Sequence, residues 1–158
     1  MVKGCYMIVA GKDATVDGSI MVARSCDGTG DFAQQILAVP RKKHSPEERL
    51  IFPKSVRFRN SEYVELSQIP ETYAYLGIMG ILEGEKISET QGGINEFQVS
   101  AGASTGGFLN QKAQEVCPRM YTSLGDHRCT LVLERCKTAR EGIKLIGELT
   151  EKYGARTD

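Results

Sequence analysis

Cys5, Arg24 and Asp27 carry a thiol, a guanidinium and a carboxylate, which together could support nucleophilic chemistry. Cys5 opens an apolar run (CYMIVA), and the two charged residues stand in the segment ARSCDG, directly after a second apolar run (SIMVA). A guanidinium beside a thiol favours the thiolate, which is the nucleophilic form of cysteine. Two structural explanations stay open. In the first, Cys5 is an ordinary buried core residue. In the second, Arg24 and Asp27 form only a salt bridge at a strand end.

The α-amine of Cys5 is a further candidate group. Four residues precede Cys5 in the chain. If the Gly4–Cys5 bond is cleaved, the freed amine, whose ordinary pKa lies near neutrality, can act as a general base toward its own side chain. A carboxylate such as Asp27 could hold that amine in place. In that case residues 1–4 would be a short leader.

A β-hairpin is the element that would bring these groups together. Residues 5–10 and 19–23 are short apolar runs, which is typical of strands covered on both faces. The segment between them (GKDATVDG) is rich in turn-forming glycine and aspartate. A hairpin folds the end of its second strand beside the start of its first. Arg24 and Asp27 are then expected near Cys5.

Asn95, in the segment GGINEF, is a candidate for stabilising negative charge. A side-chain amide fixed on a strand can donate a hydrogen bond to a developing oxyanion. Asparagine is also a common turn residue, and the spacing alone leaves both roles open.

The middle of the chain predicts further strands over residues 34–39, 56–66, 72–81 and 94–103. The polar, proline-containing segment 41–53 is interpreted as a loop. Two glycines in the run TYAYLGIMGI suggest a bulge or a close approach of another segment.

The last third of the chain changes to helical periodicity. Asp126 can cap a helix over residues 127–136. Thr138 can cap a second helix, Glu141 completes a capping box, and Gly154 supplies the stop. The apolar face of this second helix carries Ile143, Ile146, Leu149 and Tyr153. Strands followed by helices predict an α+β fold, with helices layered on a mostly antiparallel sheet.

Composition excludes several classes of function. The chain of 158 residues suits one domain, and 41% hydrophobic residues can form a core. Twenty basic residues balance twenty acidic ones, which argues against partners such as nucleic acid or a membrane surface. The basic run 41–44 is interpreted as a solvated loop. The absence of a long apolar stretch or signal peptide, with five cysteines, predicts a cytoplasmic protein with reduced thiols.

A zinc site is an alternative use of the cysteines. Cys117, His127, Cys129 and Cys136 are possible ligands, but no Cys-x-x-Cys pair accompanies them. We therefore predict neither a metal nor a cofactor. Cys26 is expected to face the opposite side of the strand from its neighbours and to be structural.

Three segments together resemble a known family. Residues 5–28 (CYMIVAGKDATVDGSIMVARSCDG), the segment GGINEFQVSAGAST and the segment TLVLERCKTAREGIKLIGELTEKYG are similar to the dipeptidase A family of N-terminal-nucleophile (Ntn) cysteine hydrolases. That family is related to penicillin V acylase and bile salt hydrolase. The resemblance implies two stacked antiparallel sheets between helical layers (αββα).

The resemblance also implies residue roles. A mature enzyme would begin at Cys5, whose sulfur attacks a peptide carbonyl of a small peptide, forms a thioester and is freed by water without a metal. Arg24 and Asp27 match the Arg-x-x-Asp pair around the nucleophile and its amine in the related acylases. Asn95 matches the Asn of an Asn-Glu motif that donates to the oxyanion there.

The sequence departs from the family in ways that leave alternatives open. Tyr6 stands where the family has Thr or another small polar residue after its cysteine. Because residues 1–4 precede the cysteine, the resemblance implies that they are a short leader that is removed. Family members are far longer, so we expect residues 5–158 to be the N-terminal part of an Ntn hydrolase domain, completed by a missing C-terminal half or by homo-oligomerisation. The alternatives to a dipeptidase are a catalytically incomplete fragment or assembly subunit, and an acylase acting on N-acyl amides.

Overall fold

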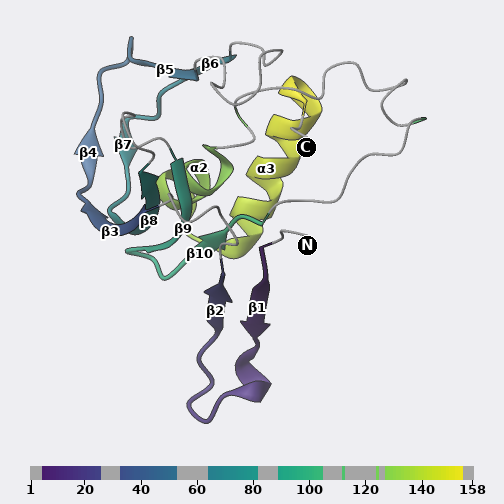
Figure 1. Ribbon diagram of the computed structural model, residues 1–158. Helices are drawn as coiled ribbons and strands as arrows, with labels where there is room; N and C mark the ends of the chain where they lie inside the picture. The colour runs from purple at the N-terminus through teal and green to yellow at the C-terminus, as the bar shows by residue number, and fades with distance from the viewer. Residues whose placement is uncertain are drawn as a thin grey trace.

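The computed structural model describes residues 5–25, 33–52, 64–81, 89–104, 112, 124 and 127–154. In this part of the chain the strands pair in antiparallel fashion and form one four-stranded sheet and three two-stranded ribbons. Two α-helices follow the strands (Figure 1). The predicted α+β class is confirmed. Neither helix is both long enough and apolar enough to cross a membrane.

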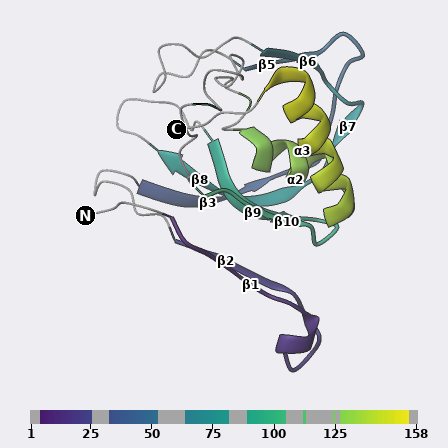
Figure 2. The same cartoon turned by 90° about the vertical axis from the view of Figure 1, so that its right-hand side faces the viewer.

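The predicted N-terminal hairpin is present. Strand β1 (Met7–Ala10) pairs with β2 (Met21–Arg24), and Met7 lies opposite Arg24. A short 3₁₀ turn over Lys12–Ala14 and Gly18, at φ 74°, reverse the chain between them. The hairpin projects away from the rest of the molecule, and both views show it as a separate arm (Figures 1 and 2).

The surfaces of this hairpin differ from the prediction. The apolar runs predicted strands covered on both faces, yet β1 and β2 are largely exposed, and the side chain of Ile8 is 70% exposed. The reason is geometric, since the hairpin contacts the sheet at its base, where β2 meets β10, and its outer part extends away from the sheet (Figure 2). The prediction that these strands are buried is wrong for the described part of the chain.

The four-stranded sheet forms the centre of the molecule. Its order is β10-β9-β8-β3, with β3 over Ala33–Val39, β8 over Tyr75–Ile81, β9 over Glu89–Asn95 and β10 over Ser100–Gly102. The predicted strands 34–39 and 72–81 correspond to β3 and to β7 with β8. The β8–β9 register shifts between Ile78 and Met79, which is the bulge that the glycines of β8 suggested.

The segment 94–103 is a turn and a strand rather than one strand. The chain reverses after Asn95, with Gln98 at φ 62°, before β10 begins at Ser100. The Asn95 side chain stabilises the turn because its Oδ1 accepts hydrogen bonds from the backbone N–H groups of Phe97 and Val99, both at 3.0 Å. The apolar and polar residues of FQVSAGA alternate as in a strand, but this segment includes part of the turn in which the chain reverses direction.

The two faces of the sheet differ in what covers them. Asn95 faces the helices, because its side chain donates to carbonyls of the α2 region. Cross-strand pairing and the two-residue alternation of strands place Ile36, Leu76 and Ile94 together on the opposite face. All three are exposed, so this apolar face, called the open face below, is uncovered in the described part of the chain.

Two helices cover the other face. α2 (Arg128–Arg135) packs on β9, and α3 (Ala139–Tyr153) packs on α2 (Figure 2). Leu133 of α2 is fully buried, and a Cβ at Gly142 of α3 would lie 3.0 Å from Val132 Cγ1, so the helices meet closely there. The predicted cap Asp126 lies outside the described residues.

The signals at the ends of α3 are confirmed. Thr138 accepts a hydrogen bond from the Glu141 N–H at 3.2 Å, and Glu141 Oε2 accepts one from the Lys137 N–H at 2.7 Å. Gly154, at φ 85°, ends the helix. One core prediction is wrong, since Ile143 is 76% exposed. The residues of α3 that pack on the buried core are Leu145, Ile146, Leu149 and Tyr153.

The segment predicted as a loop, 41–53, contains two strands. β4 (Lys42–Lys43) pairs with β7 (Glu71–Thr72), and β5 (Arg49–Phe52) pairs with β6 (Val64–Ser67). The partners come later in the chain, so local composition does not reveal them. Of the predicted strand 56–66, only residues from 64 onward are described. The buried core beside these strands comprises Phe52, Val64, Leu66, Leu124 and Leu131.

The basic run 41–44 makes specific contacts with other segments. Arg41 pairs with Glu71 and Glu96, each at 2.7 Å, and its guanidinium lies 5.4 Å from the centre of the Tyr73 ring. The two carboxylates raise the pKa of Arg41. The interpretation of this run as a solvated loop is therefore wrong for Arg41, which joins β7 to the β9–β10 turn.

Candidate active site

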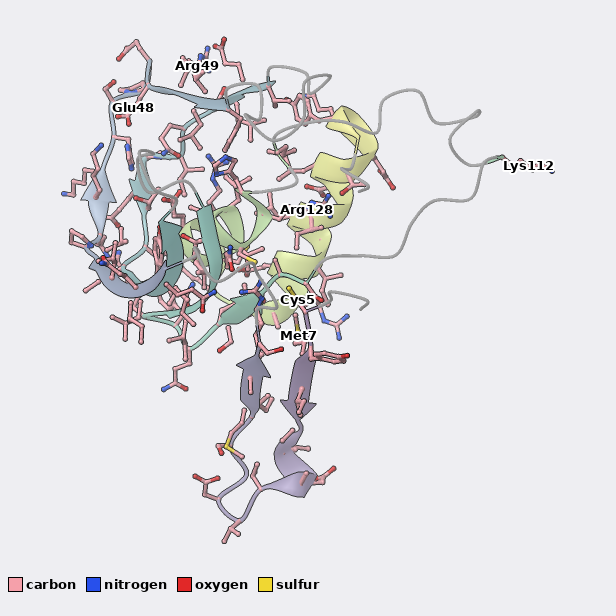
Figure 3. The ribbon with its side chains drawn as sticks, viewed as in Figure 1. Cys5, Met7, Glu48, Arg49, Lys112 and Arg128 are labelled. Atoms are coloured by element: carbon pink, nitrogen blue, oxygen red, sulfur yellow. The ribbon has the colours of Figure 1, made fainter. Side chains whose placement is uncertain are left out.

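The base of the hairpin brings Cys5 and Arg24 together. Arg24 Nη2 lies 3.6 Å from Cys5 Sγ, as the hairpin geometry predicts. The Ser25 N–H donates to the Tyr6 carbonyl at 2.9 Å, which holds the two chain segments side by side at this point. Figure 3 labels Cys5 where β1 meets the body of the molecule. Cys5 is half-buried, which leaves room for a reagent to approach.

Arg24 is held by neutral acceptors. Its Nη1 donates to Gln91 Oε1 at 2.7 Å, and its Nε donates to the backbone carbonyl of Ala103. Gln34 Nε2 donates to the same Gln91 oxygen at 3.1 Å. These contacts fix the guanidinium without neutralising it, so its positive charge is available to stabilise a thiolate at Cys5.

The segment after β10 forms the other side of the site. Ser104 Oγ donates to the Cys5 carbonyl at 3.1 Å. A Cβ at Gly102 would meet Met7 Cε at 3.3 Å, so the start of β1 packs against β10. The sequence did not single out Ser104 or Ala103 for this site. They belong to the segment GGINEFQVSAGAST, but they lie about a hundred residues from Cys5 in the chain, so no local pattern places them beside it.

Asn95 is not brought to this site. Its Nδ2 donates to the carbonyls of Leu133, at 3.0 Å, and Cys136, at 2.7 Å. It faces the helices, and it lies four residues along β9 from Gln91, which is about 13 Å of strand. The hydrogen bonds favour the turn role that the residue type left open. Its oxyanion role stays a prediction of the resemblance.

Asp27 and two of the cysteines, Cys26 and Cys117, lie outside the described residues. The interaction of Asp27 with the Cys5 α-amine therefore stays a prediction. The described site consists of Cys5 and Arg24 with the three residues that support them: Gln91, Ala103 and Ser104.

The remaining described cysteines lie in a different environment. Cys129 and Cys136 are buried. Burial raises the pKa of the Cys129 thiol to about 11, although Arg24 and Arg128 lower it in part. Burial also raises the pKa of Cys136. Both thiols are protonated near neutral pH, which is the state of a structural cysteine.

Selective alkylation follows from this contrast. At pH 8 the thiolate fraction of Cys129 is only about one in a thousand, because the pH lies about three units below its pKa. We expect iodoacetamide to modify Cys5 at least tenfold faster than Cys129 in the native protein. Peptide mapping by mass spectrometry measures both rates, and urea-unfolded protein is the control in which they converge. Equal rates in the native protein would contradict the prediction.

A second polar cluster resembles a catalytic triad but is closed to substrate. His44 Nδ1 lies 2.8 Å from Glu48 Oε1, and His44 Nε2 lies 3.0 Å from Thr72 Oγ1. The His44 side chain is 4% exposed and Thr72 is 5% exposed. The hydrogen bond to His44 lowers the pKa of Glu48. The cluster joins β4 to β7 and acts as a structural support.

The comparisons with known proteins place the chain in a family. The profile of peptidase family C69 matches residues 4–158, so the chain belongs to peptidase family C69. A probable dipeptidase of Latilactobacillus sakei is 29% identical over 156 residues, covering 97% of this chain and 31% of that protein. A probable dipeptidase A of Streptococcus pyogenes is 32% identical over 157 residues, covering 95% and 31%.

A dipeptidase of Bifidobacterium longum is 27% identical over 165 residues, covering 95% of this chain and 29% of that protein. The chain therefore spans about a third of the length of these relatives. The stretch matched by the family profile, residues 4–158, includes both hairpin residues of the site, Cys5 and Arg24.

Proposed function

We propose that the protein is a cysteine peptidase that hydrolyses dipeptides through an acyl-enzyme on Cys5. The observation that carries the proposal is the contact of 3.6 Å between Arg24 Nη2 and Cys5 Sγ in a chain of peptidase family C69. The names of the relatives support dipeptides as the substrate.

The proposed mechanism begins with removal of residues 1–4. The freed α-amine of Cys5 takes the thiol proton, and Arg24 stabilises the thiolate. The sulfur attacks the peptide carbonyl, the C–N bond breaks, and the departing amine receives the proton. Water then hydrolyses the thioester and releases the second product. Asp27 is proposed to hold the α-amine.

The proposed fold is the αββα arrangement of Ntn hydrolases. The open face supports it, because Ile36, Leu76 and Ile94 form an apolar sheet surface that a second sheet would cover. The exposed apolar side chains of β1 and β2 support the same idea. We propose that a C-terminal half or a second copy of the chain covers this face, which is open among the described residues. The buried cysteines Cys129 and Cys136 are free thiols, which supports a cytoplasmic location.

Substitution of the nucleophile tests the proposal. We expect Cys5→Ala and Cys5→Ser, made in the intact protein, to reduce dipeptide hydrolysis by at least a thousandfold, because no other group forms the thioester. The measurement is release of free amino acids, run beside an N-acyl amide substrate to separate a peptidase from an acylase. Intact mass of the active protein tests removal of residues 1–4.

Cys26→Ala is the matched control, and we expect it to retain most of the activity. Equal losses for Cys5→Ala and Cys26→Ala would remove Cys5 as the nucleophile. An active protein that keeps residues 1–4 would remove the α-amine from the mechanism.

A catalytically incomplete subunit is the second candidate. The uncovered open face and the coverage of about a third of the relatives favour it. It predicts that the 158-residue chain self-associates and is inactive alone. Size-exclusion chromatography with an activity assay on each fraction separates the candidates, since a dipeptidase complete in itself would elute as one active species.

A further inference from the structure

Gln91 occupies an irregular position in β9. Ile78 pairs with Gly92, and the next residue of β8, Met79, pairs with Thr90. β9 therefore advances two residues where β8 advances one, and Gln91 is the extra residue of a β-bulge. Bulges redirect side chains and are frequent beside active sites.

The bulge turns the Gln91 side chain to the open face. Asn95 faces the helices, and a regular alternation of side chains would place Gln91, four residues earlier, on the same face. Gln91 instead accepts a hydrogen bond from Gln34, whose pairing with Gly80 places it on the open face with Ile36. The bulge is what makes Gln91 available to the hairpin base.

The Gln91 side chain holds one edge of the Arg24 guanidinium. Arginine has donors only, so the group that faces it at 2.7 Å must be the amide oxygen of Gln91. Gln34 Nε2 donates to the same oxygen at 3.1 Å, and this second donor independently supports the same orientation of the amide. Gln91 is half-buried, so water competes only in part.

The Gln91 backbone holds a second edge of the same guanidinium. The Gln91 carbonyl accepts a hydrogen bond from the Ala103 N–H at 2.9 Å. The Ala103 carbonyl in turn accepts from Arg24 Nε. With Nη1 and Nε both held, the remaining nitrogen of Arg24, Nη2, lies toward Cys5 Sγ.

We propose that Gln91 is a positioning residue of the Cys5 site, which orients Arg24 through two neutral acceptors so that the guanidinium charge stabilises the Cys5 thiolate. The inference rests on the proposed function only in taking that thiolate as the nucleophile. A glutamate at the same position would pair with Arg24 and reduce the charge that reaches the sulfur.

The pH dependence of Cys5 alkylation tests this role. The variants are Gln91→Met, which keeps the length but removes the acceptor, and Gln91→Glu, which adds a charge. We expect the midpoint of the alkylation profile of the intact protein to rise by about one pH unit in each, equal to a tenfold loss of thiolate at a fixed lower pH. For dipeptide hydrolysis at neutral pH, we expect kcat to fall and KM to stay close to the native value.

The controls separate this inference from the proposed function. Gln35→Met and Gln35→Glu change an exposed glutamine of β3 next to Gln34, and we expect them to leave the midpoint unchanged. Arg24→Met should raise the midpoint at least as far as the Gln91 variants. An unchanged or lower midpoint in either Gln91 variant, with Arg24→Met raised, overturns the role of Gln91 alone. An unchanged midpoint in Arg24→Met overturns the thiolate mechanism itself.

Discussion

Asn95→Leu is expected to lower the free energy of unfolding by about 3–5 kcal/mol, because it leaves several buried polar groups unpaired. Asn95 is 4% exposed, and its amide makes four hydrogen bonds at once. Two are donated to the carbonyls of Leu133 and Cys136 at the end of α2. Two are accepted from the N–H groups of the β9–β10 turn, so one side chain joins helix, strand and turn.

Urea denaturation followed by circular dichroism measures this change in the intact protein. Asn95→Asp separates the two halves of the network, since it keeps an oxygen for the turn but loses both donors to α2. Ser100→Ala, at an exposed position of β10, is the control and is expected to shift the unfolding free energy by less than about 0.5 kcal/mol.

The same variants decide between the two roles of Asn95. An oxyanion donor would lose activity on substitution to leucine while its stability stayed close to that of the native protein. Substitution of a structural residue lowers the free energy of unfolding of the protein. An Asn95→Leu protein that unfolds like the native one but lacks the proposed dipeptidase activity would support the oxyanion role.

Local signals predicted the parts of the fold that depend on neighbouring residues. The hairpin of β1 and β2 follows from two apolar runs around a turn-rich segment, and Thr138 and Gly154 mark the ends of α3 by capping chemistry. These features depend on interactions between residues close together in the chain, so the local sequence is enough to predict them. The proximity of Cys5 to Arg24 follows directly from the hairpin.

Long-range contacts account for what the sequence did not reveal. β4 and β5 form in a polar segment because β7 and β6 pair with them, and that pairing has no local signature. Gln91 reaches Arg24 across 67 residues, through a bulge that depends on how β8 and β9 align. Asn95 was placed beside the thiol by resemblance, whereas its hydrogen bonds depend on where α2 ends.

Gly93→Ala is expected to lower the free energy of unfolding by about 3 kcal/mol, because β9 has no room for a methyl group there. A Cβ at Gly93 would collide with the Leu76 carbonyl and lie 2.9 Å from Leu133 Cδ1. The first is backbone of the paired strand, and the second belongs to a fully buried side chain, so neither yields easily.

Gly147→Ala is the matched control for that substitution. Gly147 lies within α3, nothing stands within 4 Å of an added Cβ, and alanine favours the helix, so we expect stability to rise by up to about 1 kcal/mol. Urea denaturation of both variants measures the difference. If the Gly93 variant were as stable as the Gly147 variant, α2 would not pack on β9 as closely as described. Close packing of β9 also bears on the proposed site, because Gln91 lies two residues before Gly93 and contacts Arg24, so we expect a strand displaced by the methyl group to shift Arg24 relative to the Cys5 sulfur.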